Sequence, residues 1–180
     1  MGFLTIGFLG MYRFENGTAI RGGMLVTDVE TKPLEFRVTA PIRPQKFQEI
    51  LYGELLDMHI SVGLVGLPLM NALQQKPNLI IVRDELFLRM NAEQEIPTIL
   101  MLKEDEPLFR QGVSVNPLNS PDSSRPSVKI CTSGQFEPRL EEFTQQLQLI
   151  FLNRNLMEPF DRLDKACEDV HSRKLGEGSR

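Results

Sequence analysis

Residues 22–54, GGMLVTDVETKPLEFRVTAPIRPQKFQEILYGE, decide the fold that the sequence predicts. Residues 24–29 and 34–39 have the length of strands, and the second stretch alternates apolar and polar side chains. Only the short turn at residues 30–33 separates them, and strands joined by a short turn pair in the antiparallel sense. The segment therefore predicts an antiparallel pair, with Leu34, Phe36 and Val38 on the dry face of the second strand.

The chain before this pair predicts a third strand. Residues 3–14 are apolar on both faces, which is typical of a strand in the middle of a sheet. Asn16 and Gly17 follow, and these residue types accept the positive φ angles of a hairpin turn. Gly22 and Gly23 permit a bulge or a close backbone contact. Together these features predict an α+β domain built on an antiparallel meander sheet.

A helix is expected to follow the meander. Pro41 and Pro44 end strand pairing, because proline donates no hydrogen bond to a neighbouring strand. From about Gln45 to Met58, apolar side chains recur at helical spacing, and we expect this stripe to pack on the sheet. The stripe consists of Phe47, Ile50, Leu51, Leu55 and Met58.

The middle of the chain predicts more strands and a polar loop. Residues 79–83 and 86–90 flank Asp84-Glu85, which predicts another hairpin, and residues 98–103 predict a further strand. Between residues 104 and 127, Pro, Ser, Asn and Asp are frequent, which predicts a flexible polar loop. Residues 1–134 are therefore expected to form the α+β core.

Two amphipathic C-terminal helices are predicted within residues 135–175, as part of the same domain. Their apolar stripes either cover the second face of the sheet or pair with another chain, and the sequence leaves both alternatives open. Residues 176–180 are predicted to form a disordered tail.

Composition argues against several classes of protein. The net charge of −4, the absence of Trp and the lack of a Lys/Arg run predict no nucleic-acid partner, and no apolar run is long enough to predict a membrane span. Two cysteines and two histidines are scattered singly, so no metal site and no cofactor are predicted. Two cysteines without a signal peptide fit a reducing cytoplasm.

One cluster of residues could bind an anion. Two guanidinium groups and a hydroxyl lie around the corner between the second predicted strand and the helix, where free helix N–H groups also bind phosphate or carboxylate. The alternative is that the first arginine is solvated and the second pairs with Glu35 or Glu49. The candidate ligand-binding residues are Arg37, Thr39, Arg43 and Tyr52.

No catalytic residue is predicted. Asp84 and Glu85 suit a turn better than acid–base catalysis, and Cys131 and Cys167 fit small buried side chains. The sequence contains no nucleophile elbow, dinucleotide fingerprint or Walker lysine.

The string PLEFRVTAPIRP, followed by Gln48 and ILYGE, resembles a segment of uncharacterised bacterial proteins. This resemblance implies a bacterial, cytoplasmic protein and no particular activity. The order of meander and helix is also similar to roadblock and longin domains, although a helix before the first strand is lacking. We therefore expect a non-enzymatic protein-interaction or regulatory module that binds a protein partner or self-associates. The alternative is a small enzyme or ligand-binding domain that recognises a phosphate or carboxylate at the corner around Arg37 and Tyr52.

Overall fold

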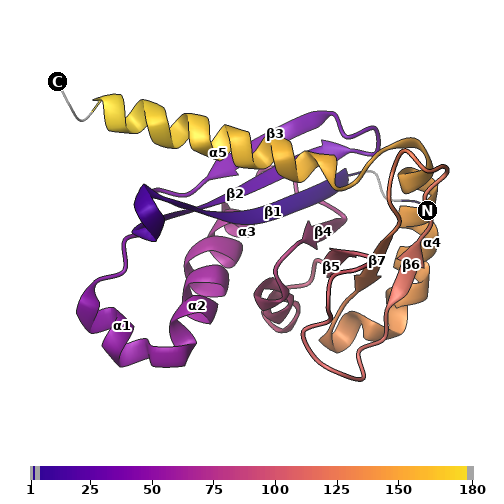
Figure 1. Ribbon diagram of the computed structural model, residues 1–180, viewed down its shortest axis with the longest axis horizontal. Coiled ribbons are helices and arrows are strands. Elements are labelled where there is room, and N and C mark those ends of the chain that lie inside the picture. The colour runs from indigo at the N-terminus through magenta and orange to yellow at the C-terminus, as the bar shows by residue number, and fades with distance from the viewer. Residues whose placement is uncertain (1, 3–4, 178–180) are drawn as a thin grey trace.

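A computed structural model describes residue 2 and residues 5–177. Within these residues, seven strands form one mixed sheet in the order β3-β2-β1-β4-β5-β7-β6, with helices on both faces (Figure 1). The strands are β1 Thr5–Phe14, β2 Ala19–Asp28, β3 Pro33–Val38, β4 Leu79–Val82, β5 Thr98–Lys103, β6 Asn116–Leu118 and β7 Val128–Cys131. The α-helices are α1 Lys46–Tyr52, α2 Leu56–Met58, α3 Leu67–Ala72, α4 Leu140–Asn153 and α5 Glu158–Glu177. Shorter 3₁₀ turns are η1 Glu15–Gly17, η2 Gly53–Leu55, η4 Glu85–Ala92 and η5 Gly134–Arg139, and η3 His59–Gly66 is a π-helix.

The antiparallel meander of the first three strands is confirmed. β1 pairs with β2 from Thr5↔Asp28 to Phe14↔Ala19, and β2 pairs with β3. The turn between β1 and β2 has positive φ at Glu15, Asn16 and Gly17, which is the backbone conformation that Asn-Gly accepts.

The sheet as a whole is mixed, and the predicted hairpin at residues 79–90 is wrong. β4 lies between β1 and β5 and runs parallel to both. The second half of the expected hairpin belongs to η4, because the Asp84 carboxylate accepts the Leu86 N–H and begins a helical turn. A short apolar run does not distinguish a hairpin strand from a buried parallel strand, and only the packing of the rest of the chain decides between them.

Two apolar cores lie on opposite faces of the sheet. One contains Phe8 and Ile81 together with the apolar faces of α4 and α5, and the other contains Leu9 and Val82 together with η3, α3 and η4. The C-terminal helices therefore cover a sheet face, which is the first of the two alternatives left open by the sequence. Residues 104–127, predicted as a loop, contain β6, and residues 178–180 of the predicted tail lie outside the described residues.

The expected close backbone contact at Gly22 and Gly23 is confirmed. A Cβ atom on Gly22 would lie 2.1 Å from Cγ1 of Val65, and one on Gly23 would lie 2.6 Å from Sγ of Cys167. Val65 of η3 and Cys167 of α5, which cover opposite faces of the sheet, therefore approach β2 at two glycines that carry no side chain.

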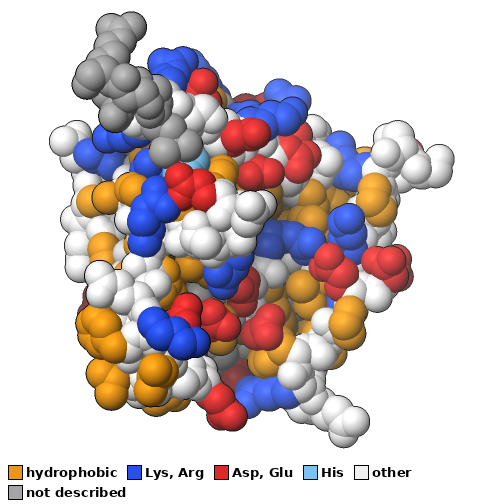
Figure 2. Space-filling view, turned by 60° about the vertical axis from the view of Figure 1, so that its left-hand side comes forward, with side chains coloured by type: hydrophobic (Ala, Val, Ile, Leu, Met, Phe, Trp, Pro, Cys, Tyr) orange, Lys and Arg blue, Asp and Glu red, His pale blue; other side chains and the backbone are white. Residues whose placement is uncertain are grey.

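The first helical segment, by contrast, does not pack on the sheet as predicted. We call Lys46–Met58 the arm, and it extends away from the sheet (Figure 1). Its side chains Phe47, Ile50, Leu51 and Leu55 are exposed. Gly53, with φ of 51°, interrupts the arm, so that its apolar stripe does not continue along one straight helix. Figure 2 shows hydrophobic side chains grouped at the lower left of one face, with Lys/Arg and Asp/Glu mixed over the remainder.

The helical stretch Lys46–Ala72 is long enough and apolar enough to cross a membrane. Core helices of soluble proteins can have the same length and composition. This stretch holds four charged side chains in its first twelve residues, which are Lys46, Glu49, Glu54 and Asp57. The cytoplasmic location stays a prediction.

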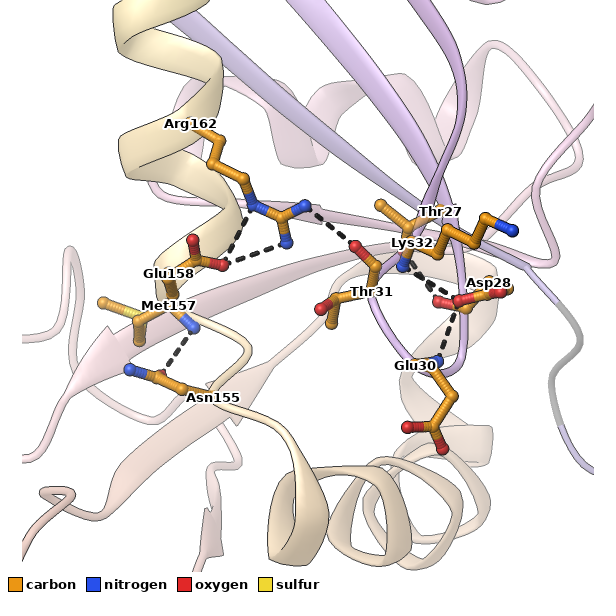
Figure 3. A network of polar contacts seen from close by, with 9 residues as sticks. All are labelled: Thr27, Asp28, Glu30, Thr31, Lys32, Asn155, Met157, Glu158 and Arg162. Atoms are coloured by element: carbon orange, nitrogen blue, oxygen red, sulfur yellow. Dashed lines mark hydrogen bonds and ion pairs between the residues drawn. The ribbon is translucent and has the colours of Figure 1, made fainter.

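Helix α5 is fixed to the sheet near both of its ends. At its start, Arg162 donates to the backbone oxygen of Thr31 at 2.8 Å and to Glu158 at 3.0 Å, and the Asp28 carboxylate orders the same β2–β3 turn (Figure 3). Further along, Nε of buried Arg21 donates to Nδ1 of His171 at 2.9 Å. These contacts set the position of the face of α5 that borders the cleft described below.

Candidate functional site

A cleft of about 260 Å³ opens where the parallel strands β1 and β4 meet α5. The register Leu9↔Val82 brings the second half of β1 level with the residues that follow β4. In sheets with parallel strands, ligands bind beyond the carboxyl ends of the strands, which is the position of this cleft. Its lining combines apolar and charged side chains and consists of Leu9, Gly10, Met11, Tyr12, Arg83, Asp84, Phe87, Phe160, Asp161 and Asp164.

Tyr12 fills the space above Gly10 on β1. A Cβ atom on Gly10 would lie 2.4 Å from the Tyr12 hydroxyl oxygen, so no larger residue fits at Gly10 unless Tyr12 moves. The hydroxyl lies 3.5 Å from the backbone oxygen of Phe160 on α5. Burial raises the pKa of Tyr12 well above its ordinary value, and Cys167, Asp164 and Asp161 act in the same direction. The phenol therefore stays protonated and is a hydrogen-bond donor.

Arg83 and Asp84 follow β4 directly and face the cleft. Arg83 donates to both carboxylate oxygens of Glu106, at 2.9 and 2.7 Å, and to the backbone oxygen of Met101 at 2.7 Å. The Arg83 guanidinium, together with the Lys103 N–H, holds the pKa of Glu106 below its ordinary value. Asp84 uses one oxygen to accept the Leu86 N–H.

The opposite wall of the cleft carries two carboxylates from α5. Asp161 and Asp164 are three residues apart, so they lie on one side of the helix, and both are exposed. With Asp84 they give the cleft three carboxylates against the single guanidinium of Arg83. The cleft thus offers acceptors for hydroxyl or amino donors and one cation for an anionic group.

The four residues predicted to bind an anion do not form one pocket. Arg37 Nε donates to Glu35 at 2.8 Å, and the Thr39 hydroxyl accepts the Gly22 N–H at 3.0 Å. Arg43 forms an ion pair with Glu15, which is neither of the partners that the sequence offered.

Tyr52 stacks on His59 with ring centroids 4.4 Å apart, and both of these rings line a pocket of about 130 Å³ with Arg43. The lining of this pocket includes neither Arg37 nor Thr39. Anion binding at the corner stays a prediction, although both guanidinium groups are engaged by carboxylates.

Glu35 makes the stability of the fold depend on pH. Its carboxylate accepts the N–H groups of Gln75 and Gln74 as well as the Arg37 guanidinium, and the Gln75 N–H contributes most to lowering the pKa of Glu35 from 4.5 to about 2. A carboxyl whose pKa is lowered by folding stabilises the fold at neutral pH, and this stabilisation is lost as pH falls from about 4.5 toward 2.

We therefore expect Glu35→Gln to lower stability at pH 7 and to weaken the loss of stability on acidification. Urea midpoints at pH 7, 4 and 2.5 measure this, and the variant and wild-type values should approach each other at the lowest pH. Glu168→Gln, an exposed change on α5, is the control and should follow the wild-type curve. Parallel curves for Glu35→Gln and wild type would contradict the role of Glu35.

Both cysteines are buried, as predicted. Burial raises the pKa of Cys131 to about 11 and that of Cys167 to about 12. Thiols with raised pKa values are poor nucleophiles at neutral pH, so neither residue is a candidate for covalent catalysis.

The arrangement of strands and helices can be compared with that of solved structures. Endonuclease V from Streptomyces avermitilis superimposes with a TM-score of 0.58 at 17% identity, covering 98% of this chain and 83% of that chain. The fold is similar to that of endonuclease V. The human endonuclease V catalytic domain gives a TM-score of 0.58 at 12% identity over 97% of this chain and 85% of its own.

Endonuclease V from Ciona intestinalis, solved with a 23mer DNA containing an inosine, gives a TM-score of 0.51 at 12% identity over 93% of this chain and 87% of its own. No protein-family model and no curated protein sequence matches the chain. The likeness to endonuclease V is therefore a likeness of fold.

Two expectations from the sequence are corrected by this likeness. The expected non-enzymatic protein-interaction module is contradicted, because the solved structures that share the fold are nucleases. The expected absence of a nucleic-acid partner is contradicted as well, because one of them holds DNA. The net charge and the absence of a Lys/Arg run are properties of the whole chain, so they do not indicate what a single cleft can bind.

Nucleases commonly use divalent cations held by converging carboxylates, and the cleft does not fit such a centre. Across residue 2 and residues 5–177, no group of three or more His, Cys, Asp or Glu side chains is arranged to hold a metal ion. At the cleft itself, Gly10 has no side chain, the Tyr12 hydroxyl fills the space above it, and Arg83 adds a positive charge. No chemical step at this cleft is therefore assigned to a metal ion.

The cleft residues gave little signal in the sequence. The sequence predicts a turn at Asp84, and it does not single out Arg83, Asp161 or Asp164 as functional residues. Asp161 and Asp164 occupy the polar side of an amphipathic helix, where charged residues are usual. A signal would have come only from knowing that β4 runs parallel to β1, since that pairing gathers the cleft residues.

Proposed function

We propose that this protein acts on nucleic acid, and that it does so in the cleft between β1, β4 and α5. The observation that supports this most is the position of the cleft. It lies beyond the carboxyl end of β4, beside the centre of a sheet whose fold is similar to that of endonuclease V over nearly the whole chain. The proposed substrate is a DNA or RNA strand with one nucleotide unit inside the cleft.

The chemistry and size of the cleft support a single nucleotide unit. Its volume of about 260 Å³ lies slightly below that of typical small-ligand pockets, which begin at about 300 Å³. Arg83 provides a guanidinium of the kind that binds phosphate, and Asp161 and Asp164 accept hydrogen bonds of the kind that base amino groups and sugar hydroxyls donate. Phe87 and Phe160 supply apolar contact area.

Binding of fluorescently labelled DNA and RNA oligonucleotides, single- and double-stranded, tests the proposal. We expect wild-type protein to raise the fluorescence anisotropy of at least one of them in a saturable and salt-dependent manner. The double variant Asp161→Leu/Asp164→Leu removes two hydrogen-bond acceptors from the cleft wall, so it should weaken this binding by about tenfold or more. Denaturing gels of the same mixtures follow cleavage of the strand.

A matched control is available on the same helix. Glu168→Leu/Asp169→Leu also removes two negative charges and adds two leucines, but neither residue lines the cleft. It should change affinity by less than about twofold, within the range of a neutral surface change. Equal effects of the two double variants would place nucleic acid elsewhere on the protein. Absence of binding and cleavage with every oligonucleotide would overturn the proposed function.

A further inference from the structure

Arg83 is the single cation in the lining of the cleft. Its guanidinium already forms an ion pair with the carboxylate of Glu106. The Arg83 side chain is 28% exposed and that of Glu106 is 31% exposed, so both ends of this ion pair reach solvent. Two nitrogens of the guanidinium donate to the two oxygens of the carboxylate, at 2.9 and 2.7 Å. Arginine makes this same two-point contact with phosphate groups.

The loop that carries Glu106 is anchored independently of Arg83. Lys129 donates from Nζ to the backbone oxygens of Glu104, at 3.1 Å, and of Glu106. The Glu106 N–H donates to the Lys103 backbone oxygen at 3.1 Å. These contacts involve the backbone of the loop, so the loop stays in place when the Glu106 carboxylate leaves Arg83 and the Lys103 N–H, which donates to its Oε2 at 2.9 Å. Arg83 in turn keeps its hydrogen bond to the Met101 oxygen at 2.7 Å, which holds the guanidinium at the cleft.

We propose that Arg83 binds a phosphodiester group of nucleic acid. In the absence of nucleic acid, Glu106 stays paired with the Arg83 guanidinium, and the phosphate takes the place of the Glu106 carboxylate on binding. This inference rests on the proposed function of the cleft. Glu106 then lowers the affinity for nucleic acid, because each binding event must first break its two hydrogen bonds to Arg83. The positive charge that meets the phosphate comes from the protein, so binding at the cleft needs no divalent cation.

The other charges of the cleft limit how much of a strand enters it. Asp84, Asp161 and Asp164 would repel a second phosphate, whereas they accept hydrogen bonds from the hydroxyl and amino groups of a nucleotide. One phosphate beside Arg83 with its nucleotide toward the carboxylates satisfies both requirements. The ligand class is therefore a single phosphodiester unit within a strand.

Glu106→Gln is the decisive variant, measured with the oligonucleotide that wild-type protein binds best and in the presence of EDTA. It keeps the shape of the side chain, removes its charge and should tighten binding by about tenfold, since the charge-assisted contact with Arg83 is lost. Glu142→Gln is the matched control. It removes the carboxylate of the ion pair between Arg139, at the end of η5, and Glu142, in the first turn of α4, with contacts of 2.9 and 3.0 Å, and it should leave affinity unchanged.

Arg83 is tested in the opposite direction. Arg83→Gln should weaken binding by about tenfold or more, and Arg83→Lys, which keeps the charge but not the two-point contact, should fall between Arg83→Gln and wild type. Thermal unfolding identifies any variant that has lost its fold, and in that event Glu106→Gln alone decides the outcome. Wild-type binding that Glu106→Gln leaves unchanged, or that requires Mg²⁺, overturns the role of Arg83 and leaves the proposed function standing. If wild-type protein binds no oligonucleotide with or without Mg²⁺, both proposals fail.

Discussion

Replacing Phe8 with alanine is expected to lower the free energy of unfolding by about 3–5 kcal/mol. Phe8 lies in the middle of β1, is 0% exposed and meets the ring of Phe160 edge to face at 5.5 Å. The variant loses the burial of the ring and leaves a cavity between the sheet and α5, which the well-packed neighbouring side chains fill only in part. Urea unfolding followed by circular dichroism measures the change.

Phe47→Ala is the control for the same chemical change at an exposed position. Phe47 on the arm is 56% exposed, so its replacement should change the free energy of unfolding by no more than about 0.5 kcal/mol. The urea m-value should stay the same in both variants, which shows that the states being compared are unchanged. A similar loss of stability in both variants would show that the arm packs against the body of the protein in solution.

Asn91→Ala is expected to cost about 2–4 kcal/mol, which is large for the loss of a small polar side chain. Asn91 is 2% exposed in η4, and it links this turn to β5 and to Thr132, the residue that follows β7. Its Oδ1 accepts the Thr98 N–H at 2.8 Å, and its Nδ2 donates to the Thr98 oxygen and to the Thr132 hydroxyl, both at 3.1 Å. Alanine leaves the buried Thr98 N–H without an acceptor, and such an unpaired group costs the full free energy of its desolvation.

Asn153→Ala provides the comparison, because the Asn153 side chain is exposed and donates to the Leu149 oxygen of its own helix, at 3.2 Å. Its replacement should change the free energy of unfolding by less than about 0.5 kcal/mol. Both variants are measured by urea unfolding at pH 7. If Asn91→Ala is as stable as Asn153→Ala, a water molecule or a rearranged backbone satisfies Thr98, and the network does not hold η4 to the sheet.

The ion pairs of the candidate sites could not be predicted from spacing along the chain. The anion corner was inferred from neighbours in the chain, and its arginines proved to pair with Glu35 and with Glu15. Pairing with Glu15 arises because the β1–β2 turn lies close to Arg43 in space, and no spacing rule along the chain indicates that approach. The same applies to Arg83 and Glu106, which are 23 residues apart in sequence.

The exposed arm illustrates a different limit. Its apolar residues have the helical spacing of a buried face, and the helical structure of the arm agrees with that spacing. Periodicity reports which residues share a side of a helix, but not whether another element covers that side. On this face of the sheet, η3, α3 and η4 supply the helical part of the core, and of the arm Leu56, close to its end, packs against that core.

The sequence by itself determined the local part of this protein: the reversal at Asn16-Gly17, the antiparallel meander that follows, and the two C-terminal helices. These features depend on backbone preferences and on side-chain periodicity within about ten neighbouring residues. Only the tertiary structure decided that β4 enters the sheet beside β1 in the parallel sense, and that α5 then lies across β1. The cleft exists because of those two choices, since it is assembled from segments whose contact is set by burial of the whole core and not by any turn between them.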